Sequence, residues 1–270
     1  MLCKKIKNLN LSVISLSGQC FRLREVESGI YNVLFNDKFV RVEKGKSKDE
    51  FLFDCSEEFF EKYLVEYFNL DVDYKKFAKL CDKDDKFLSN CIKVSDGLRI
   101  LRQDKFETIV SFIISQRKSI KAIETSIERL CTLAGKKIKN DYGVFYAFPT
   151  ATQILKLSNE ELKSIGFGYR QEYIVNFCKN YLIGQYDLDS FEKLSDDELL
   201  RNLMEIKGVG IKVASCIALF AYHRLSVCPK DVWIKRVKER KYTGGIPGKY
   251  EKDLGIIQQY WFNYAKNYKL

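Results

Sequence analysis

The spacing of apolar residues changes once along this chain of 270 residues, and the change limits the folds that the chain can adopt. From Leu11 to about Phe53, short runs of β-branched and aromatic residues alternate with turn sequences, as in antiparallel strands. Three such runs are 31–35, 38–44 and 50–55. Beyond about Ser95 the apolar residues follow the helical period of 3.6, so we predict helices from there to the end of the chain.

The two periods predict an α+β fold in two parts. Residues 1–94 are expected to form an N-terminal antiparallel β-sheet domain with one helix, which begins after the N-cap residue Ser56. Residues 95–270 are expected to form a mainly α-helical domain. Within it, Ser158 and Ser195 are each followed three residues later by a glutamate, a pattern typical of capping boxes at helix starts.

Composition narrows the class of partner and the compartment. Lys and Arg number 46 against 36 Asp and Glu, a net charge of +10, which favours a polyanionic partner but also suits an ordinary charged surface. No apolar run approaches the ~18 residues of a membrane span, and the nine cysteines include no C-x-x-C pair. We therefore expect an intracellular protein without a membrane partner, in the cytoplasm or nucleoid of a prokaryote or the nucleus of a eukaryote.

The segment from Ser195 to Val237 carries the pattern that is most informative about function. A capped helix leads into Gly208-Val209-Gly210, here called the hairpin, and a second helix starts at once. Two glycines one residue apart allow a sharp turn, and the free amides of the new helix face outward. The hairpin therefore predicts a phosphate-binding turn.

A lysine and an aspartate accompany the hairpin. Lys212 falls in the first turn of the second helix, where the helix dipole and partial burial would favour a neutral, nucleophilic amine. Asp231 falls at the N-terminus of the helix that begins near Val232, where it would cap that helix and remain ionised. On these residues alone, a surface lysine and a simple helix cap are the commoner roles.

The hairpin, Lys212 and the Pro229-x-Asp231 element together resemble the helix-hairpin-helix DNA glycosylase superfamily. The resemblance implies that the hairpin binds a DNA phosphate, that Asp231 is the obligatory carboxylate, and that Lys212 is the nucleophile of a bifunctional glycosylase/AP lyase. No set of four closely spaced cysteines follows Cys228, which argues against the iron–sulfur branch of the superfamily.

Further residues resemble the 8-oxoguanine glycosylases within that superfamily. Residues 17–22 are similar to the family's SGQ-x-FR segment, in which a glycine carbonyl accepts the N7 hydrogen of 8-oxoguanine, and Gly18 is that glycine here. Cys216 and Phe262 are similar to the side chains on either side of the flipped base, and Gln258 to the glutamine at its edge. Taken singly, these residues would be a turn glycine and core side chains.

The DNA contacts that the resemblance implies differ in part from the family pattern. The segment around Tyr169 and Arg170 resembles the loop whose tyrosine wedges into the duplex, and both residues are expected to contact DNA. In better-known eukaryotic members, asparagines and an arginine recognise the orphaned cytosine, whereas Arg117 and Ala122 occupy those positions here. Because Ala122 cannot donate a hydrogen bond to a base, we expect a relaxed opposite-base preference unless Arg117 substitutes as the DNA contact.

Two further positions bear on the site. Trp233 replaces a histidine that is common in the family two residues after the aspartate, so Lys230 or Arg236 would supply a phosphate contact instead. His223 is the only histidine in the chain and lies at the end of an apolar helix. One imidazole without ligand partners makes no metal site, so none is predicted.

The resemblance implies a base-excision-repair glycosylase/AP lyase that binds double-stranded DNA containing an oxidised purine. It would flip out 8-oxoguanine, attack C1′ with Lys212 and cleave the strand by β-elimination from a Schiff base. An alkyl-purine DNA glycosylase and a non-catalytic helix-hairpin-helix DNA-binding protein remain as alternatives. Gly18, Gln258 and Lys212 argue against the first, and the intact Lys212 and Asp231 pair argues against the second. No cofactor is required, although the resemblance implies a structural monovalent cation at the hairpin. A monomer is the default expectation.

Overall fold

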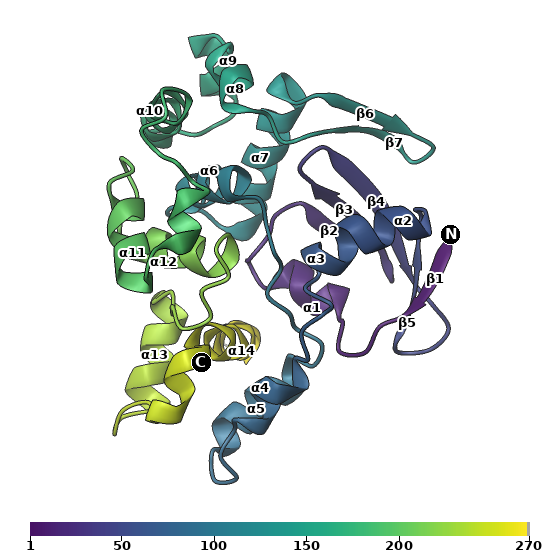
Figure 1. Ribbon diagram of the computed structural model, residues 1–270, viewed down its shortest axis with the longest axis vertical. Helices are drawn as coiled ribbons and strands as arrows, with labels where there is room; N and C mark the ends of the chain where they lie inside the picture. The colour runs from purple at the N-terminus through teal and green to yellow at the C-terminus, as the bar shows by residue number, and fades with distance from the viewer. Residues whose placement is uncertain (269–270) are drawn as a thin grey trace.

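An antiparallel sheet of five strands forms most of the N-terminal part of the computed structural model (Figure 1). The structure describes residues 1–268, so the last two residues of the predicted helical domain, 269–270, lie outside the described part. The strand order is β1-β5-β4-β3-β2. The strands are β1 (Leu2–Lys5), β2 (Leu23–Glu27), β3 (Ile30–Phe35), β4 (Lys38–Lys44) and β5 (Glu50–Phe53).

Alternation of buried and half-buried residues explains why the three predicted strands form. In β3, Tyr31, Val33 and Phe35 are buried, and the residues between them face the other side of the sheet. The strands β3 and β4 pair in register from Ile30 opposite Glu43 to Phe35 opposite Lys38. The predicted strands are confirmed, with the third ending at Phe53.

The start of the predicted strand-rich region is wrong, because residues 11–16 form a helix, α1 (Leu11–Leu16). Its N-cap residue is Asn10, whose Oδ1 accepts a hydrogen bond from the Val13 amide. Leu11 and Ile14, three residues apart, are buried on one face of the helix. Six residues are too few for the apolar spacing to distinguish a helix from a strand.

The predicted first helix and the helical part are present. The first begins at Ser56, whose Oγ accepts from the Phe59 amide, and runs as α2 (Glu57–Phe59), a π-helical turn (Phe60–Leu64) and α3 (Val65–Tyr67). Both predicted capping boxes, at Ser158 and Ser195, are formed. The other helices are α4 (Lys75–Lys79), α5 (Lys86–Val94), α6 (Lys105–Ser115), α7 (Ile120–Ala134), α8 (Ala151–Leu155), α9 (Asn159–Ser164), α10 (Arg170–Leu182), α11 (Asp196–Met204), α12 (Ile211–Phe220), α13 (Val232–Lys241) and α14 (Leu254–Tyr268), with 3-10 turns at Ser190–Lys193 and Gly248–Asp253.

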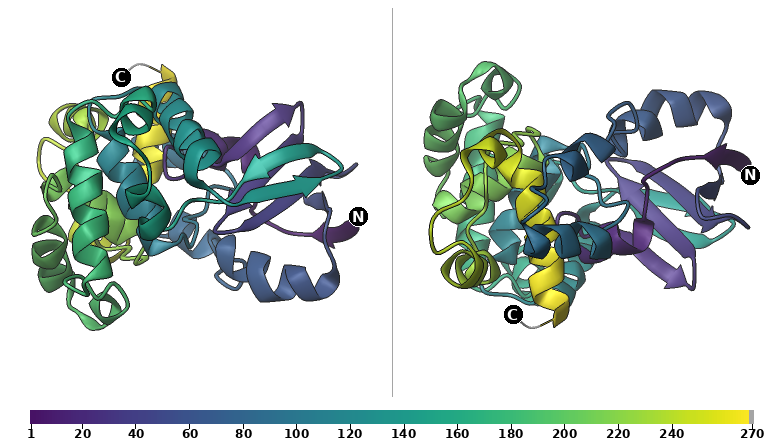
Figure 2. Two further views of the ribbon diagram at one scale, coloured as in Figure 1. Left: turned by 90° about the horizontal axis from the view of Figure 1, so that it is seen from above. Right: turned by 90° about the horizontal axis from the view of Figure 1, so that it is seen from below.

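A β-hairpin interrupts the helical part, so the prediction of helices throughout is wrong there. The strands β6 (Lys137–Asn140) and β7 (Gly143–Tyr146) pair antiparallel and lie beside the N-terminal sheet (Figures 1 and 2). The ring of Phe145 stacks on that of Phe39 in β4, with centroids 4.3 Å apart. Two strands this short are stable only through such tertiary packing, which the local sequence does not reveal.

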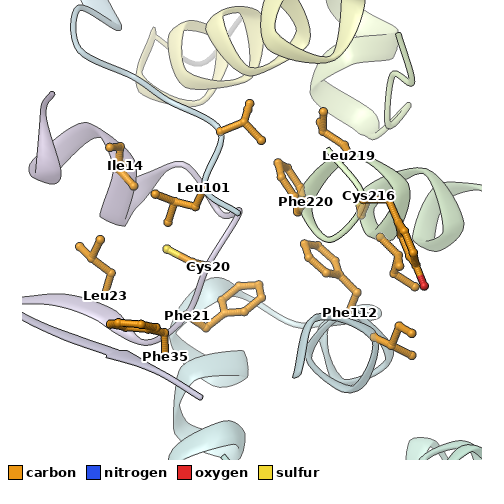
Figure 3. Close-up of a cluster of buried hydrophobic side chains, with 14 of the residues drawn as sticks. Ile14, Cys20, Phe21, Leu23, Phe35, Leu101, Phe112, Cys216, Leu219 and Phe220 are labelled. Carbon is orange, nitrogen blue, oxygen red and sulfur yellow. The ribbon is translucent and has the colours of Figure 1, made fainter. Parts of the chain in front are cut away.

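The sheet and the helical body share one hydrophobic core. The ring of Phe21 meets Phe112 of α6 edge to face at 5.8 Å, and Phe112 stacks on Phe220 of α12 at 5.5 Å. Figure 3 shows these three rings between the N-terminal segment and the helix that carries Cys216. The helix α5 packs against α14, and the boundary at residue 94 stays a prediction. In the part of the chain that the structure describes, no helix has both the length and the apolar character of a membrane span.

Candidate active site

A cavity of about 180 Å³ opens where the N-terminal part meets the helical body. Six residues singled out from the sequence line it: Lys212, Asp231, Gly18, Cys216, Gln258 and Phe262. The structure therefore brings together the two expected catalytic residues and the four expected base contacts. Larger hollows lie elsewhere, among them one of about 560 Å³ beside His223 and a groove of about 590 Å³ on another side of Lys212. The smaller cavity is the candidate site because it combines an amine, a carboxylate and buried amides.

Lys212 lies in the first turn of α12, as predicted. Its side chain is exposed, which corrects the expectation of partial burial. The amine is near both the Cys216 thiol and the Asp231 carboxylate. Burial raises the pKa of Cys216 to about 11, against the opposing effect of Lys212, so this cysteine is a neutral, packed thiol. The exposed amine is accessible to a sugar placed over the cavity mouth.

Asp231 is the N-cap of α13, as predicted. Its Oδ1 accepts a hydrogen bond from the Ile234 amide at 2.8 Å. The carboxyl group is half-buried, and this burial raises its pKa, while the Ile234 amide and Lys212 act in the opposite direction. The helix terminus therefore does not alone decide its protonation. A carboxyl group with a raised pKa is better suited to take up and release protons near neutral pH.

Gly18 holds a conformation that favours glycine, with φ +72°. A Cβ at this position would lie 3.7 Å from the ring of Phe262 across the cavity. The next residue, Gln19, fixes the segment, because its Nε2 donates to the Arg99 carbonyl and its Oε1 accepts from the Leu101 amide, both at 2.8 Å. The main chain of Gly18 is thus held firmly against the cavity.

The helix α14 supplies the amide wall of the cavity. Gln258 is buried, and its Oε1 accepts a hydrogen bond from Nε2 of Gln259 at 3.0 Å. Gln259 also lines the cavity. Sequence reasoning did not identify it, because the only signal was a second glutamine beside the first on an apolar helix. Phe262, one turn along, is partly buried against the same core.

Two residues that the sequence did not single out hold the hairpin. Gly208 has φ +85°, and a Cβ there would lie 2.2 Å from the ring of Tyr173 in α10. Its carbonyl accepts a hydrogen bond from Nε2 of Gln116 at 3.0 Å. Val209 is buried, whereas Gly210 is the N-cap of α12 and lies open to solvent. The first amides of α12 therefore face outward from a braced turn, which suits a phosphate.

The two hairpin glycines are expected to respond differently to alanine. Gly208→Ala combines a strained left-handed φ, which costs roughly 1–2 kcal/mol, with a collision with Tyr173, and it should lower the thermal unfolding temperature markedly. Gly210→Ala should leave stability nearly unchanged, because φ there is −93° and, apart from the adjoining main chain, no atom of residues 1–268 lies within 4 Å of the added Cβ. It should still weaken DNA binding by obstructing the phosphate. Equal losses of stability in the two variants would contradict this account.

The residues expected to contact DNA around the wedge differ in accessibility. Tyr169 is 50% exposed and accessible to a duplex, with its ring packed against Tyr173 and the Arg170 guanidinium. Arg170 departs from the prediction, since it is only 6% exposed and its guanidinium donates to the carbonyls of Phe167 and Gln116. It braces the loop instead of facing DNA. Arg117 is exposed between α6 and α7 with φ +51°, a left-handed conformation that is uncommon for arginine.

The other residues considered in the sequence analysis have structural partners or are exposed. Nε2 of His223 lies 3.0 Å from Nδ2 of Asn69, and burial lowers the pKa of this histidine to about 4, so it is a neutral, half-buried residue. The Arg236 guanidinium lies over the ring of Trp233 at 5.1 Å. Lys230 is exposed at the start of the Asp231 element. Among residues 1–268, no group of three or more His, Cys, Asp or Glu side chains could hold a metal ion.

An outward-facing hairpin, a first-turn lysine and a capping aspartate around one buried cavity define the class of helix-hairpin-helix DNA repair glycosylases. Residues 110–253 match the family of HhH-GPD superfamily base excision DNA repair proteins, and residues 1–109 match the N-terminal domain of 8-oxoguanine DNA glycosylase. The chain therefore belongs to the HhH-GPD superfamily, as a member that carries the N-terminal domain of the 8-oxoguanine DNA glycosylases.

Individual relatives agree with this assignment. A protein designated MBOgg1, solved with a low-affinity DNA ligand, is 34% identical with a TM-score of 0.92, and the match covers 98% of this chain and 94% of that one. The 8-oxoguanine glycosylase/lyase of Clostridium acetobutylicum, solved with double-stranded DNA containing cytosine opposite 8-oxoguanine, is 30% identical with a TM-score of 0.90 and the same coverage. The N-glycosylase/DNA lyase of Saccharomyces cerevisiae is 33% identical over 74% of this chain, and the match spans only 57% of the yeast enzyme.

Proposed function

We propose that this protein is a bifunctional DNA glycosylase/AP lyase of base excision repair that removes 8-oxoguanine from double-stranded DNA. The observation that carries the proposal is the cavity in which Lys212 and Asp231 lie beside Gly18, Gln258 and the Cys216 thiol. Membership of the superfamily and the N-terminal 8-oxoguanine glycosylase domain support the same activity. The protein acts on genomic DNA inside the cell, in the nucleoid or the nucleus, and as a monomer.

In the proposed complex, the outward amides at the start of α12 bind a phosphate, and Tyr169 fills the space that the flipped nucleotide leaves in the stack. The purine enters the cavity between Cys216 and Phe262. There the Gly18 carbonyl accepts the N7 hydrogen of 8-oxoguanine, which guanine lacks, and Gln258 binds the base edge. Flipping costs a few kcal/mol of stacking and pairing, and these contacts offset that cost.

The chemistry follows from the amine and the carboxylate. The Lys212 amine, once deprotonated, attacks C1′ as the bond from C1′ to the base breaks, and the departing base takes up a proton from water. The Asp231 carboxylate stabilises positive charge on the sugar and accepts the proton that the attacking amine loses. The sugar ring then opens to a Schiff base on Lys212. Loss of a C2′ proton breaks the C3′–O bond and nicks the strand on the 3′ side.

No step in this scheme transfers electrons, so no redox cofactor is required. A structural monovalent cation held by backbone carbonyls of the hairpin is part of the proposal. Carbonyl oxygens suit such a cation, and the Gly208 carbonyl uses one of its two lone pairs on Gln116.

A relaxed choice of opposite base is expected from Ala122 and Arg117. Ala122 offers no donor, and a lost bidentate contact removes about 1–3 kcal/mol of discrimination. Arg117 is exposed and flexible enough in its long side chain to approach more than one orphaned base. We therefore expect borohydride trapping rates on duplexes with 8-oxoguanine opposite C, A, G or T to lie within about tenfold of one another.

The same four duplexes test the function itself. Strict dependence on cytosine, lost in Arg117→Ala, would contradict the relaxed preference and identify Arg117 as the cytosine contact. No covalent adduct and no base release on any of the four duplexes would overturn the 8-oxoguanine function. Duplexes with alkylated purines would then test the alkyl-purine alternative.

A further inference from the structure

Two consecutive glutamines of α14, Gln258 and Gln259, line the cavity, and both are almost fully buried, at 2% and 3% exposure. Nε2 of Gln259 donates to Oε1 of Gln258. The carbonyl oxygen of Gln259 is itself buried and has no hydrogen-bond partner within the described residues. A residue of the cavity wall thus carries an unused acceptor.

This acceptor is unusual for its surroundings. The neighbouring helix positions carry buried apolar or aromatic side chains: Ile256, Ile257, Tyr260 and Trp261. A buried amide carbonyl left without a partner costs roughly 1–3 kcal/mol, so an apolar residue would be the more stable choice at Gln259. Because Gln259 lines the cavity, a base that enters it can supply the donor that this carbonyl lacks.

We propose that Gln259 is a second base-recognition residue, whose carbonyl accepts a hydrogen bond from an N–H donor on the pairing edge of a flipped guanine-type base. The proposal rests on the proposed function of the same pocket. The N6 amino group of adenine lies where guanine has O6. At the positions where guanine presents the donors N1–H and the N2 amino group, adenine presents N1 as an acceptor and C2–H. An acceptor placed there selects guanine-type lesions. The Gln259 amide nitrogen also fixes the orientation of Gln258 through the hydrogen bond that it donates to Oε1 of that residue.

The test is Gln259→Met, which keeps the length of the side chain and removes its polar atoms. Single-turnover excision of 8-oxoguanine is expected to fall about tenfold, the effect of one hydrogen bond of ~1.4 kcal/mol. Excision of 8-oxoadenine should not fall, so the preference for 8-oxoguanine over 8-oxoadenine decreases by about the same factor. Trapping on a preformed abasic duplex should be unchanged, because that substrate has no base to recognise.

Two further variants separate recognition from packing. Asn263→Leu removes another buried amide one turn along α14, which bonds to Ser95 and does not line the cavity, so it should leave the base preference unchanged. Gln259→Glu, whose buried carboxyl is held protonated, keeps one donor and one acceptor and should retain the preference to within about threefold. This variant also provides the test if Gln259→Met fails to fold.

An equal fall on both oxidised bases, or an unchanged preference in Gln259→Met, would overturn the role of Gln259. Loss of the preference in Gln259→Glu would overturn it as well. Failure of the proposed function gives a different result, because the wild-type protein would then neither excise 8-oxoguanine nor form an adduct on the abasic duplex.

Discussion

Lys212→Gln is expected to abolish the covalent adduct that borohydride traps on an 8-oxoguanine duplex, and to slow base excision on the order of 10³-fold or more. Glutamine keeps a similar size, but its amide nitrogen is not nucleophilic and forms no Schiff base. Because Lys212 is exposed, the substitution should not change the thermal unfolding temperature measurably. The measurement is single-turnover excision with trapping and strand nicking on the same duplex.

A matched control is Lys235→Gln, which removes an exposed lysine from α13 and should keep the adduct. Binding of an 8-oxoguanine duplex by Lys212→Gln should stay within about tenfold of wild type, since the hairpin amides remain. A trapped adduct in Lys212→Gln would show that another amine is the nucleophile.

Asp231→Asn should lower base excision by roughly 10²–10⁴-fold while preserving the fold. Asparagine caps helices as well as aspartate does, so the hydrogen bond from the Ile234 amide is kept. What is lost is the negative charge that stabilises the sugar cation and accepts the proton. Asp231→Ala is the comparison, since it loses both the charge and the cap and should cost about 1 kcal/mol of stability.

The pKa of Asp231 predicts the sign of the stability change. Burial raises this pKa above its ordinary value of 3.8, so the folded state binds the proton more tightly than the unfolded state does. Stability contributed by this group is then present at low pH. It is lost as the pH rises from the pKa of the unfolded state through the higher pKa of the folded state. Asp231→Asn should therefore unfold at or above the wild-type temperature at pH 7, and the difference should shrink below about pH 4. A lower unfolding temperature than wild type at pH 7 would contradict this reasoning.

Local chemistry made much of the fold predictable. Long alternating runs identified β3 and β4, and serine caps with a glutamate three residues later identified α9 and α11. The short elements α1, β6 and β7 were mispredicted because neighbours in space decide their conformation. The β6–β7 hairpin depends on the stacking of Phe145 against the sheet, a contact between residues far apart in the chain.

The candidate site was likewise predictable only where local sequence patterns determine it. The hairpin, Lys212 and Asp231 are identifiable because a turn, a first-turn lysine and a cap are local patterns. The burial of Arg170 and the brace that Tyr173 forms on Gly208 are results of tertiary packing. Neither leaves a signal in the residues immediately around it.

The cavity takes Gly18 from the start of the chain, Lys212 from its helical body and α14 from its end. Apart from Cys216, which shares α12 with Lys212, the residues that would recognise the lesion therefore lie in other stretches of sequence than those that would break the bond. Substitutions in the first and last stretches can alter which damaged base is accepted while the hairpin stays intact. A gene of this kind can acquire a new lesion specificity while the residues that break the bond stay unchanged.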